Sequence, residues 1–214
     1  MNATPPYNGK FVSLEGGEGA GKSTQLALIA EKLRGRGLEV VETREPGGTP
    51  GAEAIRALLL GGEADRWHPR AEALLFAAAR SDHVERVILP ALERGAWVVC
   101  DRYIDSTRAY QAGASGLSDY DVMAAHLVGS GGLMPDRTLL FTLPFEVAAE
   151  RAALRDAGKG DRFGGRDRAF HEHVAAAFQR YAQAEPARFR VIDASAPPEV
   201  VGARAMTALA DMLS

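Results

Sequence analysis

A glycine-rich stretch near the N-terminus, EGGEGAGKST at positions 15–24, has the residue types needed to bind phosphate. Its spacing matches G-x-x-x-x-G-K-[ST] in full, and it lies between an apolar run typical of a strand and a helical period. Glycines let backbone N–H groups turn inward, and the following helix adds the positive end of its dipole. Lys22 would reach the terminal phosphates, and the Ser23 hydroxyl would ligate magnesium. The alternative is a strand–helix turn that binds nothing.

The predicted nucleotide-binding residues are therefore the whole loop and the first residues of its helix: Gly16, Gly17, Glu18, Gly19, Ala20, Gly21, Lys22, Ser23 and Thr24. Glu18 is unexpected in this position, because a carboxylate repels the phosphates that such a loop receives. The pattern predicts a nucleoside triphosphate, but it does not identify the acceptor.

If the acceptor is itself a phosphate, its charge must be neutralised. Two unit charges about 4 Å apart repel by about 4 kcal/mol at an effective dielectric near 20. A nucleotide kinase therefore needs several arginines in one cleft. Residues 151–168 contain six basic and three acidic residues, a local net charge of +3 in a chain of net charge −3. Four central glycines make this segment a candidate mobile lid, and a solvated helix hairpin of mixed charge is the alternative.

Two further arginines follow predicted strands, where ligands of open α/β sheets bind. Arg44 follows the second strand in TREPGGTP. Arg102 follows the third strand in VVCDRY, next to Asp101, where P-loop enzymes keep a magnesium-associated carboxylate. A structural Asp–Arg ion pair is the alternative.

Phe76 and Arg80 in LLFAAAR are four residues apart on one face of a predicted helix. The alanines between them leave room for a flat ligand. An aromatic ring that can stack on a base, and a guanidinium that can donate hydrogen bonds to a carbonyl, would suit a nucleobase. The same spacing also fits core packing.

These residues must be positioned by a sheet. Nearly continuous apolar runs predict strands at 10–16, 38–45, 96–102, 137–143 and 189–194, as expected for strands covered on both faces. Helical periods lie between them, including one long helix over 69–95 that is interrupted near Pro90, and one that begins at Pro144. The order predicts an α/β fold, a three-layer α/β/α sandwich around a parallel five-stranded sheet with right-handed crossovers.

Composition narrows the class of protein. The 214 residues are 46% hydrophobic and 25% charged, which predicts one globular domain over 1–214. The net charge of −3 argues against a nucleic-acid partner. Cys100 is the one cysteine, and its apolar run predicts a buried side chain. No signal peptide or membrane-spanning run is present in the sequence, so we expect a cytoplasmic protein without membrane contact.

With these motifs together, nearly the whole chain resembles the bacterial thymidylate kinases (dTMP kinases). The motifs on which the resemblance rests are EGGEGAGKST, TREPGGTPGAEAIR, LLFAAAR, DRYIDSTRAYQ and the lid with DRF. The phosphate loop is widely shared. REPGGT with a downstream E-x-x-R at 53–56, together with DRY-x-x-S-x-x-AYQ at 101–111, is specific. The resemblance implies a P-loop nucleoside monophosphate kinase fold and a homodimer.

The resemblance also implies a role for each site residue. Glu18 approaches the sugar 3′-hydroxyl of dTMP, which would explain the acid in the loop. Phe76 stacks on thymine and Arg80 binds its O4. Arg102 binds the dTMP phosphate with Asp101 near magnesium, and Tyr110 disfavours a ribose 2′-hydroxyl. The implied substrate-binding residues are Arg44, Pro46, Phe76, Arg80, Arg102, Ser106, Tyr110 and Gln111.

In this family a mobile arginine comes either from the phosphate loop or from the lid. The loop here lacks one, so the lid must supply it, with Arg155 the first choice and Arg151 and Arg162 the others. The family's lid often ends D-R-[IF]-E, whereas Gly164 follows Phe163 here. Residues 193–195 resemble the adenine-side loop. The implied catalytic residues are Lys22, Arg102, Glu18 and Arg155, and the implied metal ligands are Ser23 and Asp101.

The function implied is transfer of the γ-phosphoryl group of ATP, with Mg²⁺, to dTMP, giving dTDP and ADP for dTTP synthesis. Two alternatives stay open at this point. One is a kinase for another monophosphate such as dUMP or UMP, because a single methyl group is worth only about 1–3 kcal/mol of discrimination. The other is a P-loop switch that binds nucleotide without phosphorylating a small molecule.

Overall fold

Five parallel strands form the centre of the computed structural model, which describes residues 7–63, 65–112, 116–156 and 162–213, without the side chains of 155 and 156. The strands are β1 (Lys10–Glu15), β2 (Val40–Arg44), β3 (Trp97–Asp101), β4 (Arg137–Thr142) and β5 (Phe189–Asp193). Their order in the sheet is β2-β3-β1-β4-β5. Each predicted strand is present, one to three residues shorter than its apolar run.

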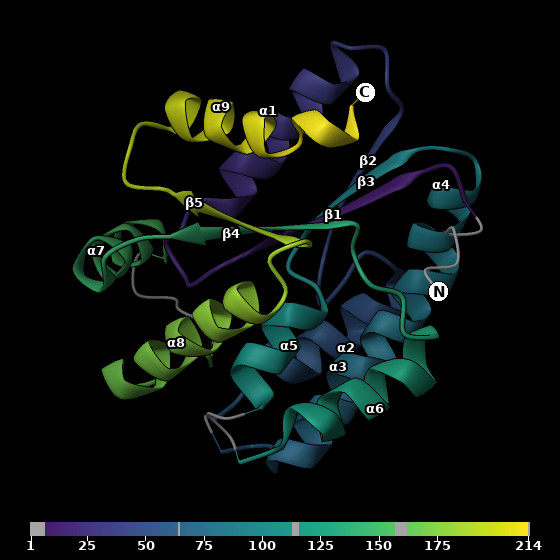
Figure 1. Ribbon diagram of the computed structural model, residues 1–214. Helices are drawn as coiled ribbons and strands as arrows, with labels where there is room; N and C mark the ends of the chain where they lie inside the picture. Colours follow the sequence, from purple (N-terminus) through teal and green to yellow (C-terminus); the bar gives the residue numbers. More distant parts are fainter. Residues whose placement is uncertain (1–6, 64, 113–115, 157–161, 214) are drawn as a thin grey trace.

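Helices cover both faces of the sheet (Figure 1). Their bounds are α1 (Lys22–Arg34), α2 (Pro50–Leu60), α3 (Pro69–His83), α4 (Leu89–Glu93), α5 (Ile104–Gln111), α6 (Asp119–Ser130), α7 (Phe145–Asp156), α8 (Arg168–Ala184) and α9 (Pro198–Ala208), with a short 3₁₀ turn at Ala210–Met212. Helices α1 and α9 lie on one face, and α2, α3, α5, α6 and α8 lie on the other (Figure 1). The predicted three-layer α/β/α sandwich is confirmed.

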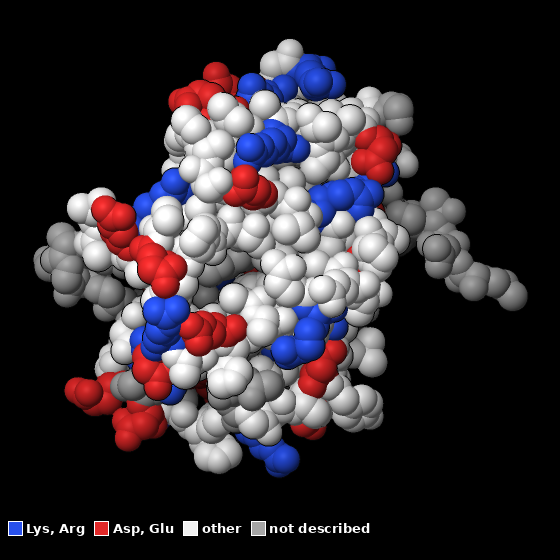
Figure 2. Space-filling view, turned by 60° about the vertical axis from the view of Figure 1, so that its left-hand side comes forward, with Lys and Arg blue, Asp and Glu red and all other residues white. Residues whose placement is uncertain are grey.

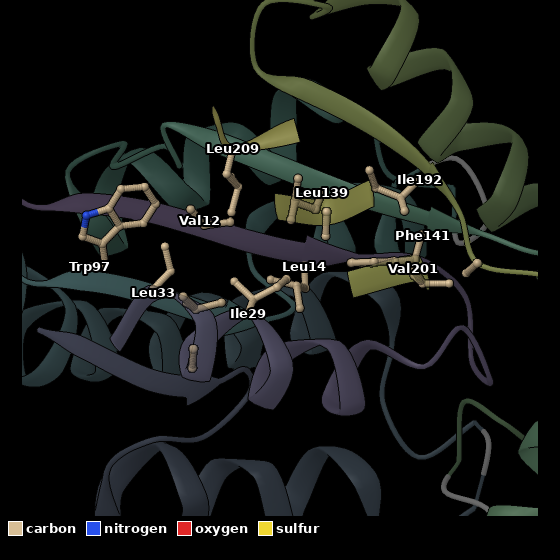
Figure 3. Packing of buried hydrophobic residues seen from close by; sticks show 14 of the residues in the cluster. Val12, Leu14, Ile29, Leu33, Trp97, Leu139, Phe141, Ile192, Val201 and Leu209 are labelled. Carbon is tan, nitrogen blue, oxygen red and sulfur yellow. The ribbon is translucent and has the colours of Figure 1, made fainter. Parts of the chain in front are cut away.

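Successive side chains of a strand point to opposite faces of the sheet and so contribute to two hydrophobic cores. Val12 and Leu14 of β1 face α1, where they pack with Ile29 and Leu33 (Figure 3). Phe11, on the opposite face of β1, joins the second core. Because side chains of a strand alternate between faces, a nearly continuous apolar run fills both cores at once.

The predicted helix over 69–95 is interrupted where proline requires it. Helix α3 continues into a π-helical turn, η1 (Val84–Ile88), and then into α4. Leu89 donates its N–H to Val84 O, five residues back, instead of four. Pro90 has no N–H to donate and its ring clashes with the carbonyl four residues earlier, so the helix widens just before it. Gly95, at a φ of +87°, then ends the run before β3.

The register of the sheet brings three loops together. Leu14 and Arg44 both pair with Asp101, so β1, β2 and β3 end at the same level. The loops that follow these strands therefore start side by side, at the edge where open α/β sheets bind ligands.

Candidate active site

The phosphate loop links the end of β1 to α1. Gly19 and Gly21 have φ angles of +71° and +80°, a backbone region that other residues rarely adopt, so the tight turn needs glycine at both positions. Lys22 Nζ donates to Gly16 O at 3.2 Å and to Gly17 O at 2.8 Å. Burial, with nearby Arg102 second, lowers the pKa of Lys22 to about 7. This ammonium lies where a bound anion would favour its charged form.

Ser23 and Asp101 meet next to the loop. Ser23 Oγ donates to Asp101 Oδ2 at 2.7 Å. The other carboxylate oxygen, Asp101 Oδ1, is buried and has no hydrogen-bond partner among the described residues. A carboxylate oxygen in this position beside a phosphate site suits Mg²⁺. This ion commonly binds one or two carboxylates and completes its coordination shell with water and phosphate oxygens. The described residues hold no cluster of three or more His, Cys, Asp or Glu that would make an all-protein metal cage.

Arg102 lies next to Lys22, since both side chains donate to Gly16 O. Its backbone has a φ of +67°, and it is the one described residue other than glycine with a positive φ. Its guanidinium donates to Gly16 O at 3.1 Å, to Ser106 Oγ at 3.0 Å and to Tyr110 Oη at 3.3 Å. A strained backbone held in place by such contacts is typical of functional positions.

Glu15, which is buried, holds the residues around Arg102 in place. Its carboxylate accepts hydrogen bonds from Tyr103 N at 2.8 Å and from Ser106 Oγ at 2.5 Å. Burial, with the nearby charge of Asp105 second, raises the pKa of Glu15 to about 8. Glu15 thus holds the first turn of α5, and through Ser106 it orients Arg102.

The REPGG turn is held by two charged side chains from α2. Arg44 Nη2 lies 2.8 Å from Glu53 Oε1, which also accepts from Gly48 N at 3.0 Å. Arg56 Nη1 donates to Pro46 O at 2.7 Å. The E-x-x-R spacing in the sequence thus places an acid and a base one turn apart on α2, each bonded to the turn.

Arg80 is only 2% exposed, and its donors are aimed by two neighbours. Its Nε donates to Glu45 Oε2 at 2.8 Å and its Nη2 to Thr107 Oγ1 at 2.7 Å. Glu45 also pairs with His83 Nδ1 at 3.1 Å. A guanidinium fixed at two of its nitrogens has a defined direction, which suits recognition of a planar ligand.

Aromatic rings line the same region. Phe76 is partly buried, and its ring centroid lies 6.0 Å from that of Phe163. Phe163 in turn lies 6.0 Å from Tyr110, edge to face. The Arg102 guanidinium lies 5.1 Å from the Tyr110 ring centroid. Tyr110 therefore connects the charged and the aromatic parts of the site.

Gln111 contributes a polar group to this region. Its Nε2 donates to Glu72 Oε1 at 3.0 Å. Its Oε1 is buried and has no hydrogen-bond partner among the described residues. An acceptor left unpaired inside a cavity is costly, so it marks a position where a ligand N–H would bind.

The three candidate lid arginines have different positions. Arg151 Nη1 donates to Ala194 O at 3.1 Å and lines the cavity. The side chain of Arg155, the first choice, lies outside the described residues, as does the lid centre at 157–161. Arg162 is buried: it binds Glu72 and donates to Leu59 O at 3.1 Å. It is not among the described residues that line the cavity.

All the other predicted substrate residues surround one cavity of about 1010 Å³. One end is formed by the phosphate loop and residues 194–198, and the other by Phe76, Arg80 and Gln111, with Asp101 and Arg102 between them. Figure 2 shows a hollowed face on which basic and acidic groups alternate. The volume, and the position of Asp101 and Arg102 between the two ends, suit two nucleotides placed end to end.

Glu18 also lines this cavity. Its negative charge acts on Arg102 and Tyr110 as well as on Lys22. The carboxylate therefore lies within reach of all three side chains, and its approach to the sugar of the acceptor stays a prediction.

Sequence reasoning missed the buried partners of the site. Glu15, Glu45, Glu72 and Thr107 each hold a ligand-facing side chain, and Phe163 adds an aromatic wall. Glu45 lies within the quoted REPGG motif, so the motif alone could have drawn attention to it. Nothing in the local sequence around Glu72 distinguishes it from a surface glutamate on a helix.

Comparisons with known proteins identify the family. The thymidylate kinase family model matches residues 14–205. A thymidylate kinase of Rhizorhabdus wittichii is 60% identical over 205 residues, covering 96% of this chain and 99% of that protein. Those of Caulobacter vibrioides and Bradyrhizobium diazoefficiens are 52% and 47% identical, covering 91% and 96% of this chain and 93% and 90% of the relatives. The chain belongs to the thymidylate kinase family.

Proposed function

We propose that this chain transfers the γ-phosphoryl group of ATP to dTMP, giving dTDP and ADP in dTTP synthesis. The observation that carries the proposal is the single cavity, in which a phosphate loop and a base-sized aromatic and polar pocket are separated by Arg102. ATP binds with its phosphates on the loop, and dTMP binds with its base near Phe76 and Arg80.

The chemistry needs little beyond position and charge. A phosphate oxygen of dTMP is already a nucleophile near neutral pH, so no general base is required. Lys22 neutralises the donor phosphates and Arg102 holds the acceptor phosphate. A lid arginine, Arg155 or Arg151, adds charge where the transferred group passes.

Magnesium would be held by Asp101 and Ser23, consistent with Asp101 Oδ1, which is buried and has no partner in the part of the chain that the structure describes. When bound, the ion supplies charge neutralisation of the donor phosphates. The role of Asp101 itself is to keep the Ser23 hydroxyl oriented toward the loop.

Recognition of the base is assigned to three side chains and recognition of the sugar to two. Phe76 stacks on the ring of thymine. Arg80, aimed by Glu45 and Thr107, donates to O4. Gln111 Oε1, which lacks a partner among the described residues, accepts from N3–H. Tyr110 packs near C2′ of the sugar, and Glu18 approaches the 3′-hydroxyl.

A panel of acceptors tests the function directly. We expect ADP release from ATP and magnesium to depend on dTMP, with dUMP less efficient in kcat/KM by about 10- to 200-fold, because one methyl group separates them. UMP should be weaker still, because Tyr110 disfavours its 2′-hydroxyl. A Lys22→Ala preparation controls for contaminating kinases. ADP release that is independent of every monophosphate would contradict the proposal.

The assembly is proposed to be a homodimer in the cytoplasm. The described surface exposes four large hydrophobic side chains on α3 and α6: Leu74, Tyr120, Leu127 and Val128. Exposed apolar groups on two packed helices are typical of a surface that a partner covers. None of the described helices is long and apolar enough to span a bilayer.

A further inference from the structure

We propose that Glu72 is a positioning residue that sets the amide orientation of Gln111 and so enforces discrimination between thymine and cytosine. The inference rests on the proposed function, in which Gln111 reads N3 of the base. It extends that function to a residue which faces Gln111 and Arg162 instead of the substrate.

The geometry leaves Gln111 one orientation. Glu72 is 3% exposed, and a carboxylate can only accept hydrogen bonds. Its Oε1 therefore requires the amide nitrogen of Gln111, Nε2, which lies 3.0 Å away. The amide oxygen is then forced to the other side, where it is buried without a partner among the described residues.

This orientation matters because thymine and cytosine differ at the edge being read. Thymine has an N–H donor at N3 and an acceptor at O4, whereas cytosine has an acceptor at N3 and a donor at N4. The fixed Gln111 oxygen accepts from the first and repels the second. A freely rotating amide would satisfy either base, because turning by 180° exchanges its donor and acceptor.

Glu72 is itself held by the segment that precedes α8. Its Oε2 accepts from Arg162 Nη2, and Arg162 Nε donates to Leu59 O at the end of α2. The side chains of Arg162 and Glu72 are 1% and 4% exposed. A carboxylate and a guanidinium buried together each require the other, because an unpaired buried charge is costly. Arg162 thus occupies Oε2 of the carboxylate, so that Oε1 is the oxygen that meets Gln111.

The same segment closes one wall of the base pocket. Phe163, next to Arg162, contacts both Phe76 and Tyr110 with ring centroids 6.0 Å apart. The ion pair therefore joins the position of Phe163 to the orientation of Gln111. The carboxylate of Glu72 thus fixes both the aromatic wall of the base pocket, Phe163, and its polar group, Gln111.

The test compares kcat/KM for dTMP and dCMP by ADP release in wild type, Glu72→Gln, Gln111→Ala and the double variant. We expect Glu72→Gln to lower the dTMP-to-dCMP ratio at least about tenfold, mainly through KM, because Gln111 can then turn. In the Gln111→Ala background the same change should leave the ratio unaltered. Glu85→Gln, at an exposed position further along the same helical run, is the matched control and should behave as wild type.

Because Glu72→Gln leaves Arg162 without its carboxylate, the variant can lose stability. Glu72→Gln with Arg162→Met removes both charges and repeats the test in a protein whose folding is checked by circular dichroism. A folded variant of either kind with an unchanged ratio would overturn the inference, as would additive effects of Glu72→Gln and Gln111→Ala. Wild type without dTMP-dependent ADP release would instead defeat the proposed function.

Discussion

At the scale of single residues, the site is organised by buried carboxylates behind its ligand-facing groups. Glu15 holds Ser106, which binds Arg102, and Glu45 fixes Arg80. Glu72 does the same for Gln111. Arginine and glutamine side chains are flexible, so each needs a second bond to keep its direction. The charges that meet the substrates are thus prearranged before binding, which lowers the cost of aligning two polyanions.

Arg102 combines a functional side chain with an unfavourable backbone. At a φ of +67° a residue with a Cβ is strained by about 1–2 kcal/mol relative to glycine. We expect Arg102→Ala to reduce kcat by about 10³-fold while the fold survives. Arg102→Gly should be equally inactive but about 1 kcal/mol more stable to urea than Arg102→Ala, because glycine accepts this conformation.

Urea titrations followed by circular dichroism give the stability difference, and ADP release gives kcat. Equal stability of the two variants would argue against backbone strain at this position. Near wild-type turnover in either variant would remove the guanidinium from the mechanism.

At the scale of elements, two features place the site. The shared level at which β1, β2 and β3 end brings the phosphate loop, the REPGG turn and Arg102 together. On the covered face, α6 approaches α3 closely, because Gly129 has no side chain: a Cβ there would lie 3.1 Å from Ala77 O. The α3 backbone that carries Phe76 and Arg80 is therefore supported from outside by α6.

The predicted dimer contact lies on the exposed face of α3 and α6. Val128 is 90% exposed on α6, and its neighbour Leu127 is exposed as well. We expect Val128→Glu with Leu127→Glu to convert a dimer to a monomer in analytical ultracentrifugation, because charges cannot be buried unpaired in an apolar interface.

Leu154→Glu is the control, since Leu154 is 78% exposed on α7, away from this face, and should leave the mass unchanged. A wild-type chain that sediments as a monomer would refute the assembly proposal. An unaltered dimer in the double variant would place the interface elsewhere.

At the scale of the whole molecule, the sheet separates two cores, and the core on the α3 and α6 side contains ionisable groups. His126 of α6 lies edge to face against Tyr103, with ring centroids 5.8 Å apart, and its Nε2 donates to Leu133 O. Burial, with the charge of Arg80 second, lowers the pKa of His126 to about 4. The fold therefore accommodates this imidazole in its neutral form.

Acid should destabilise the fold through this residue. The unfolded chain protonates His126 near its ordinary pKa of 6.5 and the folded chain only near 4, so the unfolded state binds more protons between these values. The free energy of unfolding should fall as pH drops from 6.5 to 4, with about 3 kcal/mol arising from His126.

Urea titrations at several pH values test this. His126→Gln keeps a donor for Leu133 O but cannot titrate, so its stability should change less over the window than that of wild type. His173→Gln, at an exposed position on α8, serves as control and should follow wild type. Identical pH profiles for wild type and His126→Gln would exclude this residue as the acid-sensitive group.

Several features could be predicted before any coordinates. The strands follow from nearly continuous apolar runs, and the phosphate loop follows from glycines that can adopt a positive φ. The helix is interrupted before Pro90 because proline has no N–H to donate. Buried Cys100 is confirmed for the same reason, because it continues an apolar strand. The sequence-based prediction of Arg162 as a phosphate-facing lid arginine is not supported by its position, since it is buried against Glu72 and Leu59 O and is not among the described residues that line the cavity.

The sequence by itself determined which elements form and which side chains carry the chemistry, because periodicity and motif spacing act over a few residues. Tertiary structure alone decided the direction of those side chains. The pairing of Glu72 with Gln111, of Glu45 with Arg80 and of Glu15 with Ser106 spans 39, 35 and 91 residues. Such contacts exist only once parallel strands align and helices pack across them, so no local pattern could predict them.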